Sequence, residues 1–140
     1  MKVTNRFVPL TTIVHPLLRT FPKGPSILQA ADARDHIWSY DRWSTHGAAE
    51  MWRLQRQVKR ELSFIRVPLL AIQSTQDSVV APDSGRRLIA DWGAADKELL
   101  TLHESDHAVL LDIERDVVSA RVGDFFDDHA ARRRAGAPGQ

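Results

Sequence analysis

Cysteine is absent from the 140-residue sequence, and no apolar run approaches the roughly 18 residues that a membrane-spanning helix needs. The first absence excludes a disulfide scaffold, a thiolate zinc site and a cysteine nucleophile. A surplus of one charge sign is also missing, because 19 Lys and Arg residues face 18 Asp and Glu residues. We therefore expect one globular domain, without a membrane span and without a nucleic-acid partner.

A secretory signal peptide is not expected at the N-terminus. Lys2 and Arg6 precede some apolar residues, which is the order found in a signal peptide. Pro9, His15 and Pro16 interrupt that stretch, however, and no small-residue cleavage site follows. We therefore expect a cytoplasmic protein, with which the lack of cysteine is compatible. The prolines also indicate short helices and loops over the first 36 residues.

Residues 47–63 have the spacing of an amphipathic helix. Apolar residues recur there at intervals of three or four, and basic residues occupy positions between them. Ser44 or Thr45 is a suitable N-cap for this helix. The apolar positions are Met51, Leu54, Val58 and Leu62.

The pattern then changes to alternating strands and helices. Val67–Ile72 is a short continuous apolar run, typical of a parallel strand that is buried on both faces, and Glu98–Leu102 predicts a second strand. The helix between them is expected to begin at Pro82 and to have Gly93 as its C-cap. A long helix is expected over 112–133, with an apolar stripe formed by Ile113, Val117, Val118, Val122, Phe125 and Phe126.

This order of elements predicts an α/β fold with two parallel strands joined by a helical crossover. Two strands buried on both faces ordinarily need neighbouring strands and further covering helices. The sequence therefore resembles one end of a larger α/β sheet.

Asp77 and His107 follow the two predicted strands, at the edge where an open α/β sheet gathers its reactive groups. A carboxylate beside an imidazole fixes the tautomer of the histidine and stabilises the imidazolium that forms when it takes a proton. Considered one at a time, Asp77 is interpreted as a solvated loop carboxylate and His107 as a histidine that is hydrogen-bonded to backbone. Their joint placement after consecutive strands favours an acid–histidine pair.

The segments around these two residues resemble the α/β-hydrolases, with the best match to the carboxylesterase and monoacylglycerol lipase branch. Residues 65–83, IRVPLLAIQSTQDSVVAPD, look like the segment that carries the catalytic acid. Residues 102–118, LHESDHAVLLDIERDVV, look like the segment that carries the catalytic histidine. The resemblance implies that Asp77 is the acid and His107 the general base of a serine triad.

The resemblance also implies an organisation. Residues 1–63 would be a helical cap-like segment, residues 64–131 the C-terminal portion of the hydrolase core with its last two parallel strands and flanking helices, and residues 132–140 a flexible tail. The G-x-S-x-G nucleophile elbow of the family is missing, and Gly24–Leu28 matches it at three places at most. We therefore expect a fragment that supplies acid and histidine and is inactive alone, with no cofactor.

The implied substrate is a small carboxylic ester with a hydrophobic acyl group. Candidates to line an acyl pocket are Trp38, Trp43, Met51 and Trp52, with plain core packing as the alternative. The implied partner is the missing N-terminal half or a second copy of the chain. A different class of function is a non-catalytic remnant or interaction module that kept this part of the fold.

A rival motif covers the same residues, because His103–His107 reads H-E-x-x-H, the signature of zinc hydrolases. That chemistry requires His103 and His107 one helical turn apart on a helix. The preceding residues read as a strand and Ser105–Asp106 as a turn, so we expect no metal site. Glu104 and Asp106 are expected to be surface charges.

Overall fold

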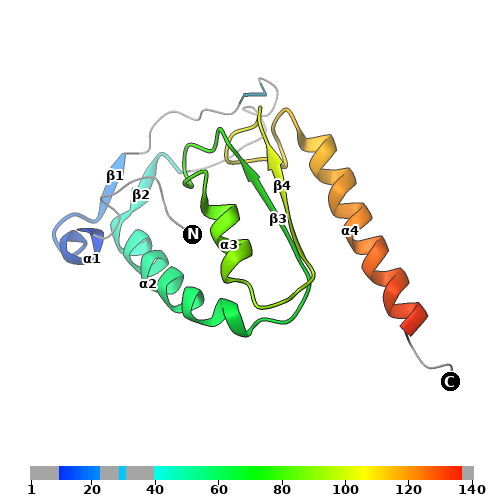
Figure 1. Ribbon diagram of the computed structural model, residues 1–140. Helices are drawn as coiled ribbons and strands as arrows, with labels where there is room; N and C mark the ends of the chain where they lie inside the picture. The colour runs from blue at the N-terminus through cyan, green and yellow to red at the C-terminus, as the bar shows by residue number, and fades with distance from the viewer. Residues whose placement is uncertain (1–9, 23–28, 31–39, 137–140) are drawn as a thin grey trace.

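The computed structural model describes residues 10–22, 29–30 and 40–136 (Figure 1). A small segment of helices and short strands comes first, and an alternating strand–helix unit follows. In chain order the elements are α1 (Thr11–Val14), β1 (Thr20–Pro22), β2 (Arg42–Ser44), α2 (Thr45–Glu61), the 3-10 helix η3 (Leu62–Phe64), β3 (Leu69–Ser74), α3 (Ser84–Asp91), β4 (Lys97–Leu102) and α4 (Arg115–Gly136).

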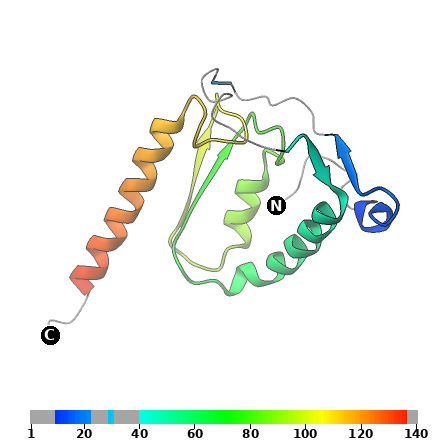
Figure 2. The same ribbon diagram turned by 180° about the vertical axis from the view of Figure 1, so that it is seen from behind.

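β3 and β4 pair in parallel, which confirms the predicted pairing, with Leu69 opposite Lys97 and Ser74 opposite Leu102. α3 connects the two strands and packs on one side of them, whereas α4 lies on the other side (Figures 1 and 2). β3 begins just after Pro68, because proline has no N–H to donate to the ladder. The carboxyl ends of both strands therefore lie at the same edge of the sheet.

Two glycines allow close approaches around α3. A Cβ at Gly85 would lie 2.8 Å from Leu99 Cδ1, so the glycine lets the helix pack closely on the sheet. Gly93 was expected as the C-cap, but Trp92 holds that position, and no glycine in the described residues has a positive φ. Gly93 is instead required by space, since a Cβ there would lie 2.1 Å from the carbonyl oxygen of Ser63.

The start of α2 is fixed as the sequence predicts. The Ser44 hydroxyl accepts the backbone N–H of Gly47 at 3.1 Å, which satisfies one of the free donors of the first turn. The buried side chain of Thr45 donates to the carbonyl oxygen of Arg19 at 2.9 Å. These contacts orient α2 relative to the segment before it.

A short antiparallel pair, β1–β2, adds strands to the segment that was expected to be helical. Phe21 lies opposite Trp43, and the Arg42 guanidinium donates to the Thr20 hydroxyl at 2.8 Å. Strands of three residues are too short to show a period of two, and their pairing joins residues twenty or more positions apart. The prediction of a helical segment over residues 1–63 is therefore corrected, because its described residues form both helices and strands.

α4 begins at Arg115 and ends at Gly136, three residues later at each end than predicted. Its last turns include part of the expected tail, and residues 137–140 lie outside the described residues. Val118 is fully buried, but Ile113, Val117 and Phe126 from the predicted stripe are more than half exposed. The cause is the narrow sheet, since two strands cannot cover the whole stripe of a 22-residue helix.

The core of the described residues is correspondingly small. Ala71 is buried in β3, but Leu69, Leu70 and Ile72 are only half-buried, so this strand is not covered on both faces as predicted. None of the helices in the described part of the chain combines the length and apolar character that a bilayer crossing requires. The fully buried side chains at this edge of the sheet are mostly those that hold the two loops described next.

Candidate functional site

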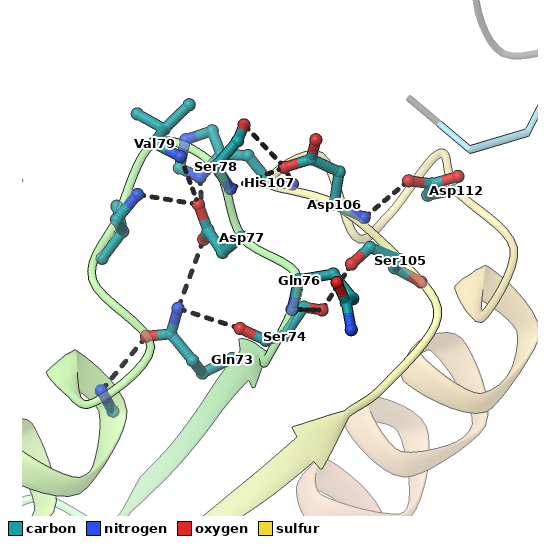
Figure 3. A network of polar contacts seen from close by, with 12 residues as sticks. Gln73, Ser74, Gln76, Asp77, Ser78, Val79, Ser105, Asp106, His107 and Asp112 are labelled. Atoms are coloured by element: carbon teal, nitrogen blue, oxygen red, sulfur yellow. Dashed lines mark hydrogen bonds and ion pairs between the residues drawn. The ribbon is translucent and has the colours of Figure 1, made fainter. Parts of the chain in front are cut away.

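The loop after β3 is held by the side chain of Asp77 itself. Asp77 Oδ1 accepts the backbone N–H groups of Val79 at 2.9 Å and Val80 at 2.7 Å, which closes a tight turn. Asp77 Oδ2 accepts the Gln73 amide at 3.3 Å, and the other end of that amide accepts the backbone N–H of Gly85 at 3.1 Å. The carboxylate is thus fixed from β3, from its own loop and from the start of α3 (Figure 3).

The loop after β4 is held by other carboxylates, of which Glu114 is the first. It accepts the backbone N–H groups of residues 103–105 at 2.9 to 3.1 Å. The buried Ser105 hydroxyl donates to Glu114 Oε2 at 2.8 Å and accepts the backbone N–H of Glu114 at 3.1 Å. Burial alone would raise the pKa of Glu114, but these hydrogen bonds outweigh it and hold the pKa below its ordinary value.

Asp112 is the second anchor and is completely buried. Burial alone would raise the pKa of this carboxyl, but four backbone N–H groups together hold the pKa of Asp112 below its ordinary value. Two of these donors come from the far end of the chain, so the anchor joins the N-terminal segment to the loop. The donors are Asp106 at 2.7 Å, Ala30 at 2.6 Å, Gln29 at 3.3 Å and Ile113 at 3.0 Å.

Asp77 and His107 meet where the two loops come together. Asp77 Oδ2 lies 3.0 Å from His107 Nδ1, which confirms the predicted juxtaposition. A carboxylate oxygen only accepts, so the Nδ1–H of His107 donates and Nε2 is left with its lone pair. Nε2 makes no hydrogen bond with any residue that the structure describes. The Asp77 side chain is 7% exposed and that of His107 is 49% exposed, so the carboxylate is shielded from solvent while the ring is half open to it.

Asp106 differs from its predicted role. It was expected to be a surface charge, but it is only 2% exposed. Its Oδ1 accepts the backbone N–H and the hydroxyl of Ser78, both at 2.9 Å, and the backbone N–H of His107 at 2.6 Å. Nothing local in the sequence indicated this, because Ser78 belongs to the other loop. Glu104 is exposed, as predicted.

Two buried hydroxyls were also missed as part of the site's framework. Ser74, at the end of β3, donates to the carbonyl oxygen of Ser105 and accepts the backbone N–H of Gln76 at 3.0 Å. Ser74 and Ser105 are both fully buried. Their position at strand ends was the available signal, since a small polar residue there often satisfies loop backbone.

An apolar groove of about 540 Å³ runs from this pair along β3, between α2 and α3. Asp77 and His107 are among its polar lining residues, and Met51 from α2 lines it as well. Trp43 and Trp52 are not among the lining residues, and Arg56 stacks over the Trp52 ring at 4.8 Å. Trp38, the fourth predicted pocket residue, lies outside the described residues, as does Gly24–Leu28. Apolar residues on its walls include Leu54, Val58, Leu70, Ile72, Val80 and Leu88.

The H-E-x-x-H residues do not form a zinc-binding helix. The strand β4 ends at Leu102, and the residues that follow form bends and turns. His103 Nδ1 lies 3.5 Å from the Thr75 hydroxyl, whereas His107 turns to Asp77. Across the described ranges, no three His, Asp or Glu side chains are grouped so as to hold a metal ion.

Comparison with known proteins gives a family match and a curated relative. The profile of a hydrolase family described as serine aminopeptidase, S33, matches residues 1–114. A thermostable monoacylglycerol lipase from Bacillus sp. (strain H-257) is 29% identical over 92 residues, which is 66% of this chain and 37% of the lipase.

Three solved structures share the fold. A structure of the metagenome-derived lipolytic enzymes LipS and LipT superposes with a TM-score of 0.83 at 22% identity, covering 91% of this chain and 51% of the other. Monoacylglycerol lipase from Paleococcus ferrophilus gives 0.69 at 20% identity, covering 85% and 50%. A soluble variant of monoglyceride lipase from Saccharomyces cerevisiae gives 0.68 at 18% identity, covering 87% and 48%. The chain thus spans about half the length of these structures.

Proposed function

Because the chain belongs to the hydrolase family described as serine aminopeptidase, S33, we propose that Asp77 and His107 are the acid and the general base of a serine-type carboxylic ester hydrolase. The observation that carries the proposal is the 3.0 Å contact between Asp77 Oδ2 and His107 Nδ1. A carboxylate with little exposure orients the half-exposed ring, and its Nε2 has no competing partner among the described residues. Those are the properties that a general base for a hydroxyl nucleophile needs.

The serine is proposed to lie in a part of the fold that these 140 residues do not supply. His107 Nε2 takes the proton of that hydroxyl as its oxygen bonds to the ester carbonyl carbon, and Asp77 stabilises the imidazolium. The imidazolium returns the proton to the leaving alcohol as the C–O bond breaks, which leaves an acyl-enzyme. Water then attacks the acyl carbon with the same base and releases the acid and the serine hydroxyl.

A hydrophobic acyl group is the proposed part of the substrate that this chain contacts. The groove next to the pair is walled largely by apolar side chains, and Met51 lies on its wall. The names of the similar proteins support this part of the proposal, since they describe monoacylglycerol lipases and lipolytic enzymes. Trp43 and Trp52 are a weaker part of the proposal, because both lie apart from the groove lining.

The test is complementation with the rest of a relative. The chain is co-produced with the part of the Bacillus lipase outside the 92 matched residues, and hydrolysis of p-nitrophenyl butyrate is measured against each part alone. We expect activity only in the complex, lost about 10³-fold or more in His107→Ala. His103→Ala is the matched control, because His103 is an exposed histidine of the same loop, and it should stay within twofold of the unchanged complex.

Two outcomes would contradict the proposal. Equal loss in both histidine variants would point to the loop's structure rather than to the base. Efficient turnover by the chain alone that survives Ser26→Ala would show that the nucleophile has been misplaced. If the two parts do not associate, translation of the DNA upstream of the Met1 codon gives a second test, since a G-x-S-x-G elbow in frame is expected there. A stop codon in its place would favour a non-catalytic module.

A further inference from the structure

Asp106 carries more contacts between the two loops than either proposed catalytic residue does. Its Oδ1 accepts two hydrogen bonds from Ser78, the residue directly after Asp77. The same oxygen accepts the backbone N–H of His107 at 2.6 Å. One atom therefore joins the chain beside the acid to the chain that carries the ring (Figure 3).

The other oxygen of this carboxylate, Oδ2, destabilises the fold. Asp106 Oδ2 is buried and has no hydrogen-bond partner among the described residues. Buried carboxylate oxygens without donors destabilise a fold, and they are uncommon in native proteins. An apolar side chain would avoid that cost but would lose the contacts of Oδ1, so those contacts are what the carboxylate contributes at this position.

The other anchors of the histidine loop cannot replace this contact. Glu114 binds the backbone of residues 103–105, and Asp112 binds residues 29–30 and 106. Neither reaches the loop after β3. Ser74 does cross between the loops, through the carbonyl oxygen of Ser105, but it does so at the strand ends, two residues before the imidazole.

We propose that Asp106 is a positioning residue that clamps the acid loop to the histidine loop and so sets the Asp77–His107 contact. This inference rests on the proposed function, because it assigns Asp106 to the geometry of that acid–base pair. Without the clamp, Ser78 and His107 are free to separate, and the ring loses the fixed direction of its Nδ1–H. Rings that are misplaced by about 1 Å lose catalytic rate more than substrate binding.

The test reads the ring directly and uses the full 140-residue chain. The ¹⁵N resonances of the His107 imidazole, in its neutral state, distinguish the Nδ1–H tautomer from the Nε2–H tautomer. We expect the unchanged chain to show the Nδ1–H form and Asp106→Ala to show a mixture of both. Asp106→Asn keeps an acceptor oxygen for Ser78 and His107, so it should restore the single tautomer. Glu104→Ala, an exposed acid of the same loop, is the matched control and should change nothing.

The outcomes separate this inference from the proposed function. Asp77→Asn must disturb the tautomer if the pair exists, and an unchanged spectrum in that variant would overturn the proposed function and the inference with it. A disturbed spectrum in Asp77→Asn together with an undisturbed one in Asp106→Ala would overturn the inference alone. A merely structural role would lower the melting temperature and leave the tautomer unchanged.

A second variant covers the case in which Asp106→Ala does not fold. Ser78→Ala removes only the hydroxyl from the clamp and keeps the backbone N–H donor. We expect it to produce a smaller share of the Nε2–H tautomer, and no change would count against the clamp. In the complemented enzyme, Asp106→Ala should lower kcat about 10- to 100-fold with KM within twofold. A rise in KM at constant kcat would contradict positioning.

Discussion

The two loops that meet at the candidate site are held in opposite ways. In the loop after β3, the functional side chain is also the anchor, because Asp77 accepts the N–H groups of Val79 and Val80. In the loop after β4, the His107 ring bonds only to Asp77 among the described residues, and three other carboxylates bind the backbone. Those carboxylates are Asp106, Asp112 and Glu114.

In the loop after β3, one side chain therefore serves both the proposed reaction and the stability of the loop. In the loop after β4, different side chains serve these two roles. A substitution at Asp77 removes the acceptor for the His107 ring and also the acceptor that stabilises the turn after β3. A change at His107 removes the base and leaves every backbone anchor of its loop in place. Variants of the two loops should therefore differ in how stability and activity change together.

The largest expected effect on stability is in the histidine loop, at Asp112. Asp112→Ala leaves buried N–H groups without acceptors, among them those of Asp106 and Ala30, and each such group costs about 1–3 kcal/mol. We expect the free energy of unfolding to fall by about 3 kcal/mol or more in urea denaturation. Asp127→Ala, an exposed acid on α4, should change it by less than about 0.5 kcal/mol. A similar fall in the free energy of unfolding in both variants would contradict the role of Asp112 as an anchor.

The next effect is expected at Asp77, where stability and function should be lost together. Asp77→Ala deprives the N–H groups of Val79 and Val80 and the Gln73 amide of their acceptor. We expect a loss of about 2 kcal/mol in the free energy of unfolding, as well as loss of ester hydrolysis in the complemented enzyme. Unchanged stability in denaturation would mean that the turn does not depend on this carboxylate.

Acid should act on the histidine loop before it acts on the rest of the fold. The pKa values of Asp112 and Glu114 are lowered in the folded protein, so both groups contribute stability above their unfolded pKa values of about 4. That contribution is lost as the pH falls through the lower folded pKa values. The protection of the backbone amides of residues 103–107 against hydrogen exchange, relative to their intrinsic exchange rates, should therefore fall below about pH 4, and Glu114→Gln should weaken this pH dependence. Equal pH dependence in that variant would contradict the assignment.

The smallest effect on stability is expected for His107. The ring is half exposed and anchors no backbone, so His107→Ala should change the free energy of unfolding by less than about 0.5 kcal/mol. Activity in the complemented enzyme should nevertheless be lost. A melting temperature that drops as far as in Asp77→Ala would remove the distinction between the two loops.

The parts of the fold that the sequence predicts are those with local signals. A continuous apolar run predicts β3, and the placement of Asp77 and His107 follows from the rule that parallel strands end at one edge. Ser44 as N-cap is likewise a local signal and is confirmed.

The parts that sequence reasoning missed depend on distant partners. Asp106 reads as a turn residue next to a histidine, and its burial follows only once Ser78, 28 positions earlier, is placed against it. The β1–β2 pair is missed for the same reason, since three residues ending at Pro22 carry no periodic signal. Long-range contacts such as these are not visible in any window of the sequence.

The Asp112 carboxylate also has a consequence for how the chain is made. It joins residues 29–30 to residue 106, more than seventy positions apart, yet it leaves the ribosome after all of them. Proteins begin to fold from the N-terminal side during synthesis, and β3, α3 and β4 all leave the ribosome before this anchor does. A nascent or truncated chain that stops before residue 112 would contain Asp77 and His107 but would lack the Asp112 carboxylate that anchors the loop after β4. The loop after β4 would thus be locked only once the chain has been made past residue 112.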